Sequence, residues 1–329
     1  MAQANDRAVE WDKCSADPAY FIHTYCLIDE PQGETLTVIP FHLWPAQVQT
    51  VWLFLAHRLF IILKARQLGI SWLCCAYALW LCVFQDGRRV LLFSQGQDES
   101  DELLRRIKVM WERLPDWMRA RVDVDKLNTS EIVWVNRSSA ESFPATQKSG
   151  RSLTASLVIA DEFAFMQWAS ELYTGMKSTI DGGGQLIILS TANGARGIFH
   201  QLWKKAVERL NNFVPIFLSW RMRPGRDDAW YARVASEAVS TSLMMQEYPA
   251  SPEEAFSATD AEKFLADMLW WDNCREEVPP FTRNDPLVLG VDAGINNDSF
   301  ALVGVTRKPN DSQSIMVRYS REWKPRRDG

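Results

Sequence analysis

Short apolar runs recur along the first two thirds of the chain, and polar loops and helical patterns separate them. The clearest runs cover residues 60–63, 89–94, 157–160 and 186–189. Strands buried on both faces produce continuous apolar segments, and their alternation with helices is typical of a mostly parallel sheet covered by helices. The pattern therefore predicts an α/β fold in which ligands bind at the carboxyl ends of the strands.

Apolar residues at helical spacing predict three helices in the same part of the chain, over residues 46–57, 72–84 and 98–118. The first 40 residues carry few periodic signals besides a strand candidate at 35–39. We therefore expect the sheet and its helices to begin after a short lead-in.

The pattern changes after about residue 212. A strand candidate at 213–220 is followed by a basic turn that contains proline and glycine, and then by helices to about residue 247. A second change follows Pro279 and Pro280, where the segments 287–291 and 299–305 are spaced as a β-hairpin. We expect a small subdomain after the sheet and a separate β-rich segment after that.

Composition and charge narrow the class of protein without naming a ligand. The chain has 329 residues, of which 47% are hydrophobic and 23% are charged, so we expect a globular protein. Its net charge of −5 neither requires nor excludes a nucleic-acid partner, because a local basic surface is enough to bind one. The six cysteines lack the spacing of a zinc site, and the apolar run 72–84 is shorter than the ~20 residues that span a bilayer. These features predict a cytoplasmic protein without a membrane segment.

The polar loop KARQLGIS follows the first apolar run and has part of the spacing of a phosphate-binding loop, G-x-x-x-x-G-K-[ST]. Gly69 and Ser71 keep their places, whereas Lys64 stands where the first glycine belongs and isoleucine replaces the usual lysine. Gly69 allows a tight turn, and Ser71 offers a hydroxyl to Mg²⁺. Lys64 and Arg66 both remain candidates for the cation that binds phosphate. Alone, the loop is equally typical of a basic surface.

Acidic and hydroxyl side chains follow two later apolar runs. Asp161 and Glu162 come directly after residues 157–160, and Ser190 and Thr191 come after the next run. A strand-end aspartate can coordinate Mg²⁺, and the adjacent glutamate can polarise an attacking water. A single acid pair after a strand is common. A phosphate loop and an acid pair in this order, each after an apolar strand, together favour a site that handles phosphates.

These motifs resemble those of the large terminase subunit of tailed bacteriophages, the motor that packages DNA into procapsids. The most specific match is QEYPASPEEAF at residues 246–256. FHLWPAQ at residues 41–47 is similar to the adenine-contacting Q motif, which implies that Gln47 contacts the base. KARQLGIS resembles the deviant Walker A motif of terminases, in which the lysine lies at the start of the loop. The resemblance thus favours Lys64 as the phosphate cation and leaves Arg66 as a candidate sensor of the γ-phosphate.

The same resemblance implies roles for the residues at the later strand ends. Asp161 corresponds to the Walker B aspartate, which would hold Mg²⁺ together with Ser71, and Glu162 corresponds to the catalytic glutamate. Ser190-Thr191-Ala192 is similar to the motif that couples hydrolysis to DNA movement. Arg151 is a candidate arginine finger for a neighbouring subunit. Contact with the DNA backbone, or simple exposure to solvent, are the alternatives for Arg151.

The last segment resembles the opening hairpin of the terminase nuclease, which has an RNase H-like fold. GVDAG at residues 290–294 carries the likeness. It implies that Asp292 is a metal-binding carboxylate and Asp298 an auxiliary one, in a site that holds two divalent metals when complete. Residues 281–329 are fewer than the ~100 that such a domain needs. We therefore expect an incomplete nuclease domain without endonuclease activity in this chain.

The full expectation is a P-loop NTPase-type, mostly parallel sheet flanked by helices, with a lid subdomain and the first strands of an RNase H-like domain. The expected regions are a lead-in (1–40), an ATPase core (41–211), a lid (212–265), a linker (266–280) and the nuclease segment (281–329). The resemblance implies an ATP-driven motor that moves double-stranded viral DNA into procapsids in the host cytoplasm. It also implies a homo-oligomeric ring on the portal protein and a small terminase subunit as partner.

Two alternatives for the function stay open. One is a helicase-like ATPase that remodels nucleic acid without packaging it. The other is a defective prophage remnant that binds nucleotide without turnover, and the replaced loop lysine and the short nuclease segment motivate it.

Overall fold

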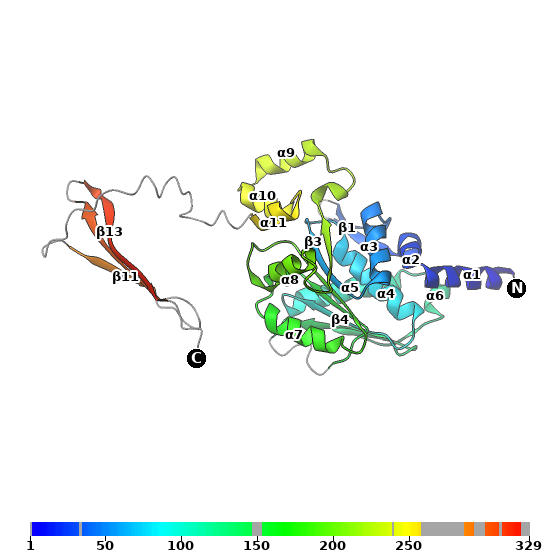
Figure 1. The fold of residues 1–329 in the computed structure, drawn as a ribbon. Coiled ribbons are helices and arrows are strands. Elements are labelled where there is room, and N and C mark those ends of the chain that lie inside the picture. The colour runs from blue at the N-terminus through cyan, green and yellow to red at the C-terminus, as the bar shows by residue number, and fades with distance from the viewer. Residues whose placement is uncertain are drawn as a thin grey trace. The chain divides into compact units, whose positions relative to one another are not determined.

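The computed structural model describes residues 2–32, 35–146, 153–238, 240–257, 286–292, 300–308 and 311–323 (Figure 1). It divides into two compact units, Met1–Glu262 and Lys263–Gly329. None of the described helices is both long and apolar enough to cross a membrane.

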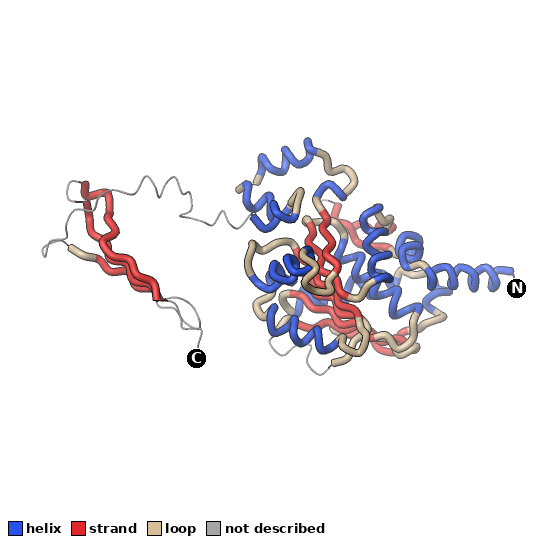
Figure 2. The backbone as a smooth tube through the Cα atoms, in the orientation of Figure 1, coloured by secondary structure: helices blue, strands red, loops and turns tan. Residues whose placement is uncertain are grey.

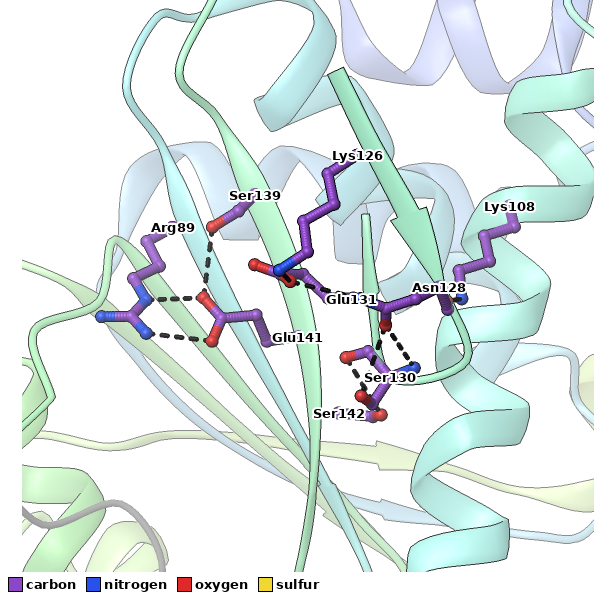
Figure 3. Close-up of polar contacts among 9 residues, drawn as sticks. All are labelled: Arg89, Lys108, Lys126, Asn128, Ser130, Glu131, Ser139, Glu141 and Ser142. Atoms are coloured by element: carbon purple, nitrogen blue, oxygen red, sulfur yellow. Dashed lines mark hydrogen bonds and ion pairs between the residues drawn. The ribbon is translucent and has the colours of Figure 1, made fainter. Parts of the chain in front are cut away.

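An eight-stranded sheet forms the centre of the first unit (Figure 2). Its first six strands in spatial order are parallel, and the last two are joined by antiparallel pairing, which confirms the mostly parallel sheet expected from the sequence. The antiparallel extension is shown in Figure 3. The spatial order is β10 (Val214–Leu218), β3 (Leu59–Lys64), β9 (Gln185–Ser190), β8 (Leu157–Asp161), β4 (Arg89–Ser94), β7 (Ser139–Pro144), β6 (Glu131–Trp134) and β5 (Val124–Asn128).

The central strands are apolar because each face of the sheet has its own core. In β3, Phe60 and Ile62 pack into one cluster of buried residues, while Ile61 and Leu63 pack into a second cluster. The first cluster includes α4 (Ile70–Phe84) and α5 (Gln97–Glu112), and the second includes α7 (Ala169–Thr179) and α8 (Gly197–Val207). Figure 1 shows these two pairs of helices on opposite faces of the sheet. Side chains on both faces of such a strand are therefore apolar, so the sequence shows a continuous apolar run instead of alternating apolar and polar residues.

The helices at 46–57 and 72–84 are confirmed as α3 (Pro45–Ala56) and α4. The single helix expected over 98–118 is wrong. It divides into α5 and the short α6 (Asp116–Arg119), because Pro115 stands between them and has no backbone N–H to continue the first helix.

The first 40 residues are far more regular than their sequence pattern indicates. They form α1 (Ala2–Ala16), α2 (Pro18–Tyr25) and a hairpin of β1 (Leu27–Gln32) with β2 (Thr35–Pro40). Asp17 caps α2 by accepting a hydrogen bond from the Tyr20 amide at 2.9 Å. Phe21 and Ile22 are completely buried in the same cluster as α4. α2 has only eight residues, which is too short for a clear apolar periodicity, and its stability comes from contacts with residues distant in the sequence.

After the sheet, the described residues up to 257 form three helices and an aromatic cluster. β10 ends before the short 3₁₀ helix η2 (Trp220–Met222), so the strand expected over 213–220 is shorter than predicted. The Trp220 ring lies 4.7 Å from Tyr231 and 5.7 Å from Trp230, measured between ring centroids. The helices are α9 (Asp228–Glu237), α10 (Thr241–Glu247) and α11 (Pro252–Ser257).

The second unit contains a three-stranded antiparallel sheet of β11 (Val288–Asp292), β12 (Phe300–Lys308) and β13 (Asp311–Trp323). Val288 pairs with Val305, which confirms the hairpin expected between residues 287–291 and 299–305. Asp292 is exposed at the end of β11.

Candidate active site

The polar residues expected to meet at one edge of the sheet do meet there. Lys64, Ser190 and Asp161 are the last residues of β3, β9 and β8, and these three strands are parallel neighbours. Parallel neighbouring strands have their carboxyl ends at the same edge of the sheet, so the parallel pairing itself brings residues together that are far apart in the sequence.

A buried ion pair lies at the centre of this edge. Lys64 Nζ is 2.8 Å from Glu162 Oε1, and the lysine is only 6% exposed. Burial disfavours the charged lysine, but Asp161 and Glu162 outweigh burial and raise the pKa of Lys64. Burial also opposes ionisation of Glu162, and the lysine outweighs it and lowers the pKa of Glu162. The pair is therefore charged at neutral pH.

Asp161 is held differently from its neighbour. Burial raises its pKa, against the opposing attraction of Lys64. Its carboxylate is hydrogen-bonded to the hydroxyl of Ser71, and its Oδ1 accepts the Glu162 amide at 2.9 Å. A carboxylate beside a hydroxyl is a donor set that fits Mg²⁺, which takes one or two protein oxygens and completes its shell with phosphate and water. No group of three or more metal-ligating side chains occurs among the described residues.

The backbone turns sharply at the second acid. Glu162 has φ 51° and ψ 39°, a left-handed conformation that is strained for a residue with a side chain. Its Oε2 lies 3.5 Å from both the Ser190 hydroxyl and the Thr191 amide. The Thr191 hydroxyl is buried and has no hydrogen-bond partner among the described residues. Ala192 is buried in the second core cluster.

The loop after β3 has the shape of an anion site. Gly69 has φ +68°, and a Cβ there would lie 3.0 Å from Gln47 Nε2, so glycine is required for both reasons. α4 begins at the next residue, and the first amides of a helix have no partner within it. These amides and the helix dipole favour a negative group in front of Ser71.

Gln47 connects this loop to the start of α3. It is 1% exposed, its Nε2 donates to the Leu68 carbonyl at 3.0 Å, and its Oε1 accepts the Trp44 amide at 2.9 Å. Both polar atoms of the side chain are thus engaged in holding the loop against α3.

A pocket of about 670 Å³ opens beside the loop. This volume lies within the range of small-molecule and cofactor sites. Lys64 and Ser71 line it, whereas Arg66 does not and instead contacts the Glu247 carboxylate. The complete lining is Ile28, Asp29, Glu30, Ile39, Pro40, Phe41, His42, Trp44, Gln47, Lys64, Gln67, Leu68, Gly69, Ile70, Ser71, Trp72, Arg106 and Arg223.

Several residues around the site were not predicted from the sequence. Arg106 and Arg223 line the pocket, and the hairpin β1–β2 contributes Asp29 and Glu30. The basic turn after β10 was visible in the sequence. Its contact with the loop was not, because the bonds of Arg223 and Arg226 to the loop go to backbone and amide oxygens.

The structure does not test three predicted residues. Arg151 and Asp298 lie outside the described residues, and Asp292 lies in the second unit. Their roles stay predictions.

Comparison with known proteins gives the family and the fold. The family description "Terminase large subunit, T4likevirus-type, N-terminal" matches residues 61–265. The large terminase of bacteriophage HK97 is similar in structure, with 17% identity, coverage of 95% of this chain and 68% of that one, and a TM-score of 0.52. The large terminase of the thermophilic bacteriophage D6E, in a complex with ADP, has 10% identity, coverage of 86% and 69%, and a TM-score of 0.53.

Proposed function

Because this chain belongs to the family of terminase large subunits of the T4-like type, we propose that it is an ATPase that drives DNA packaging. One observation carries the proposal. Lys64 at the end of β3, Ser71 at the start of α4, and the adjacent pair Asp161 and Glu162 after β8 meet at one sheet edge, beside a pocket of about 670 Å³. The ADP complex of the D6E terminase supports a nucleotide as the ligand.

We infer that the phosphates of ATP lie on the loop and the base lies toward Phe41 and Trp44. The loop and the start of α4 supply amides to the phosphates, and the rings of Phe41 and Trp44 also line the pocket. Gln47 bonds to both Leu68 in the loop and Trp44 before α3. It is thus our candidate for contact with the base, as well as a support for the loop.

Lys64 is the proposed phosphate cation. It lines the pocket, while Arg66 faces Glu247 and remains a candidate sensor. When phosphate oxygens replace Glu162 as the partner of Lys64, the freed carboxylate can accept a hydrogen bond from water. Glu162 would then orient that water for attack on the γ-phosphorus, the bond to the bridging oxygen would break, and ADP and phosphate would result.

Ser71 and Asp161 are the residues that would hold Mg²⁺, which neutralises charge on the phosphate oxygens when bound. Ser190 ends β9, and Thr191 and Ala192 follow it. Ser190 and Thr191 lie beside Glu162, which suits a segment that responds to hydrolysis. The proposed partners are double-stranded DNA, the portal protein, the small terminase subunit and further copies of this chain in a ring. Arg151 remains a candidate arginine finger in that ring. Asp292 and Asp298 remain candidate ligands of nuclease metals.

The decisive experiment compares Glu162→Gln with the wild-type chain in DNA-stimulated ATP hydrolysis. We expect hydrolysis to fall by about 100-fold or more while ATP still binds, because the variant keeps the shape of the side chain and loses its basic oxygen. Glu141→Gln is the matched control, since Glu141 is an ion-paired carboxylate on the same sheet whose partner is Arg89 and not Lys64.

Full hydrolysis by Glu162→Gln would contradict the assignment. ATP binding by the wild type without hydrolysis, even with DNA and portal protein, would favour a nucleotide-binding remnant. Duplex unwinding by the wild type would favour a helicase-like ATPase.

A further inference from the structure

Two arginines of the turn after β10 bind the phosphate loop, Arg223 at the lining of the pocket and Arg226 outside that lining. Arg226 donates from Nη1 to the Arg66 carbonyl and from Nη2 to Gln67 Oε1, both at 3.0 Å. Arg223 donates from Nη1 to the Gln67 carbonyl at 2.9 Å and from Nη2 to Glu30 Oε1 at 3.0 Å. The backbone and side chain of Gln67 are therefore both held by arginines.

Gln67 needs such support because its backbone is strained. Its φ of 58° lies in the left-handed region, which residues with a side chain adopt only where their surroundings enforce it. The Gln67 side chain is exposed, so packing does not supply the force. The hydrogen bonds from Arg223 and Arg226 act directly on Gln67 and on the carbonyl that precedes it, so they can fix this conformation.

Arg226 is itself fixed firmly. It is 9% exposed, and its guanidinium carbon lies 4.5 Å from the centre of the Trp230 ring and 5.2 Å from that of Tyr248. Burial, with a smaller contribution from Arg223, lowers the pKa of Arg226 to about 10, so the side chain stays charged at neutral pH. A buried cation in contact with two rings has less freedom to move than the exposed side chain of Gln67, so we expect the loop to conform to the cation.

We propose that Arg226 is a positioning residue that holds Gln67 in its left-handed conformation and so shapes the loop from Lys64 to Ser71 for phosphate. Arg226 does not line the pocket, so it acts through the loop and not by touching nucleotide. The proposal rests on the proposed function, because it assumes that this loop receives the phosphates of ATP.

The test measures ATP affinity by titration calorimetry for the wild type and for Arg226→Gln. We expect the Kd to rise about tenfold, the ratio that corresponds to losing support for one strained residue. We expect kcat at saturating ATP to change much less, because bound phosphates can themselves restore the loop. Arg226→Lys should fall between the two, since it keeps the charge but cannot bond two oxygens in a fork.

The matched control is Arg221→Gln. Arg221 lies in the same turn and stacks 4.3 Å from the Trp220 ring, but it pairs with Asp228 at 2.6 Å instead of binding the loop. A second substitution, Gln67→Gly, tests the mechanism because glycine adopts positive φ without strain. In the Arg226→Gln background it should recover most of the lost affinity, which a purely structural role for Arg226 does not predict.

A third readout needs no nucleotide. Hydrogen exchange of the amides in the loop should be faster in Arg226→Gln than in the wild type or Arg221→Gln. Unchanged exchange in the loop overturns the inference even if the chain binds no ATP, an outcome that would defeat the proposed function separately. Loss of affinity that Gln67→Gly does not restore, together with a large fall in melting temperature, also overturns it.

Discussion

The sheet carries two groups of ion-paired acids, one at the carboxyl edge of its central strands and one on its antiparallel extension. At the central edge, Lys64 lies 2.8 Å from Glu162. On the extension, Arg89 forms two bonds of 2.7 and 2.9 Å with Glu141, and Lys126 lies 2.5 Å from Glu131 (Figure 3). The distances are alike, so geometry of the pairs alone does not separate the two groups.

Burial and charge balance do separate them. The Lys64 side chain is 8% exposed, against 59% for Lys126. One lysine faces two acids at the central edge, and burial raises the pKa of the second acid, Asp161. Each acid drawn on the extension has its own base. The central group therefore has one more negative charge than positive charge, which a metal ion can neutralise. On the extension, the charges of the drawn pairs are already balanced.

The strongest test of this difference between the two groups is to replace the lysine in each of them. In Lys64→Met, we expect ATP hydrolysis to fall by about 100-fold or more, because a preorganised cation is lost from the phosphates. Melting temperature should also fall, because Asp161 and Glu162 are then buried together without a cation. Both are measured on the purified chain, by phosphate release and by thermal unfolding.

Lys126→Met is the control for that experiment, with the same change of side chain on the extension. We expect its hydrolysis to match the wild type. Equal losses in the two variants would show that burial does not distinguish the groups.

A smaller effect on stability is expected from Asp161→Asn, which should make the fold more stable while it abolishes activity. Burial raises the pKa of Asp161 in the folded chain, so ionised Asp161 costs stability at every pH above that raised pKa. Asparagine removes the cost, so the melting temperature at pH 7 should rise. Hydrolysis should be lost, because the carboxylate that would hold Mg²⁺ is gone.

Thermal unfolding across pH checks that sign. As pH falls through the raised pKa of Asp161, this carboxylate becomes protonated in the wild type, and its burial no longer costs stability. The difference in stability between Asp161→Asn and the wild type should therefore shrink. A variant that is less stable than the wild type at pH 7 would show that the hydrogen bond from Ser71 outweighs the cost of burial.

The central strands were predictable because burial on both faces leaves a direct trace in the sequence. The strand-end cluster was predictable for a related reason, since parallel neighbours bring their carboxyl ends together whatever lies between them. α1 and α2 left no such trace. The Trp80 indole donates to the Cys14 carbonyl at 2.8 Å, and such contacts join residues whose partners are distant in sequence.

The hold of Arg226 on the loop was hidden for the same kind of reason. A carbonyl oxygen is present at every residue, so an acceptor such as that of Arg66 carries no sequence signal. The Lys64–Glu162 pair was also unforeseen, although both residues were predicted site members. Which partner a lysine takes within a cluster depends on side-chain geometry that the spacing does not contain.

The smallest effect is expected on the extension itself, from Glu141→Gln. The variant breaks a fork of two bonds, but the Arg89 side chain is 36% exposed and water can replace the lost partner. Partly exposed pairs contribute about 0–1 kcal/mol, so the free energy of unfolding in urea should fall by no more than that. High salt should shrink the difference further, because screening weakens an exposed pair more than a buried one. If the free energy of unfolding instead fell by several kcal/mol, the extension would depend on its ion pairs as strongly as the central edge. The contrast between the two groups would then be wrong.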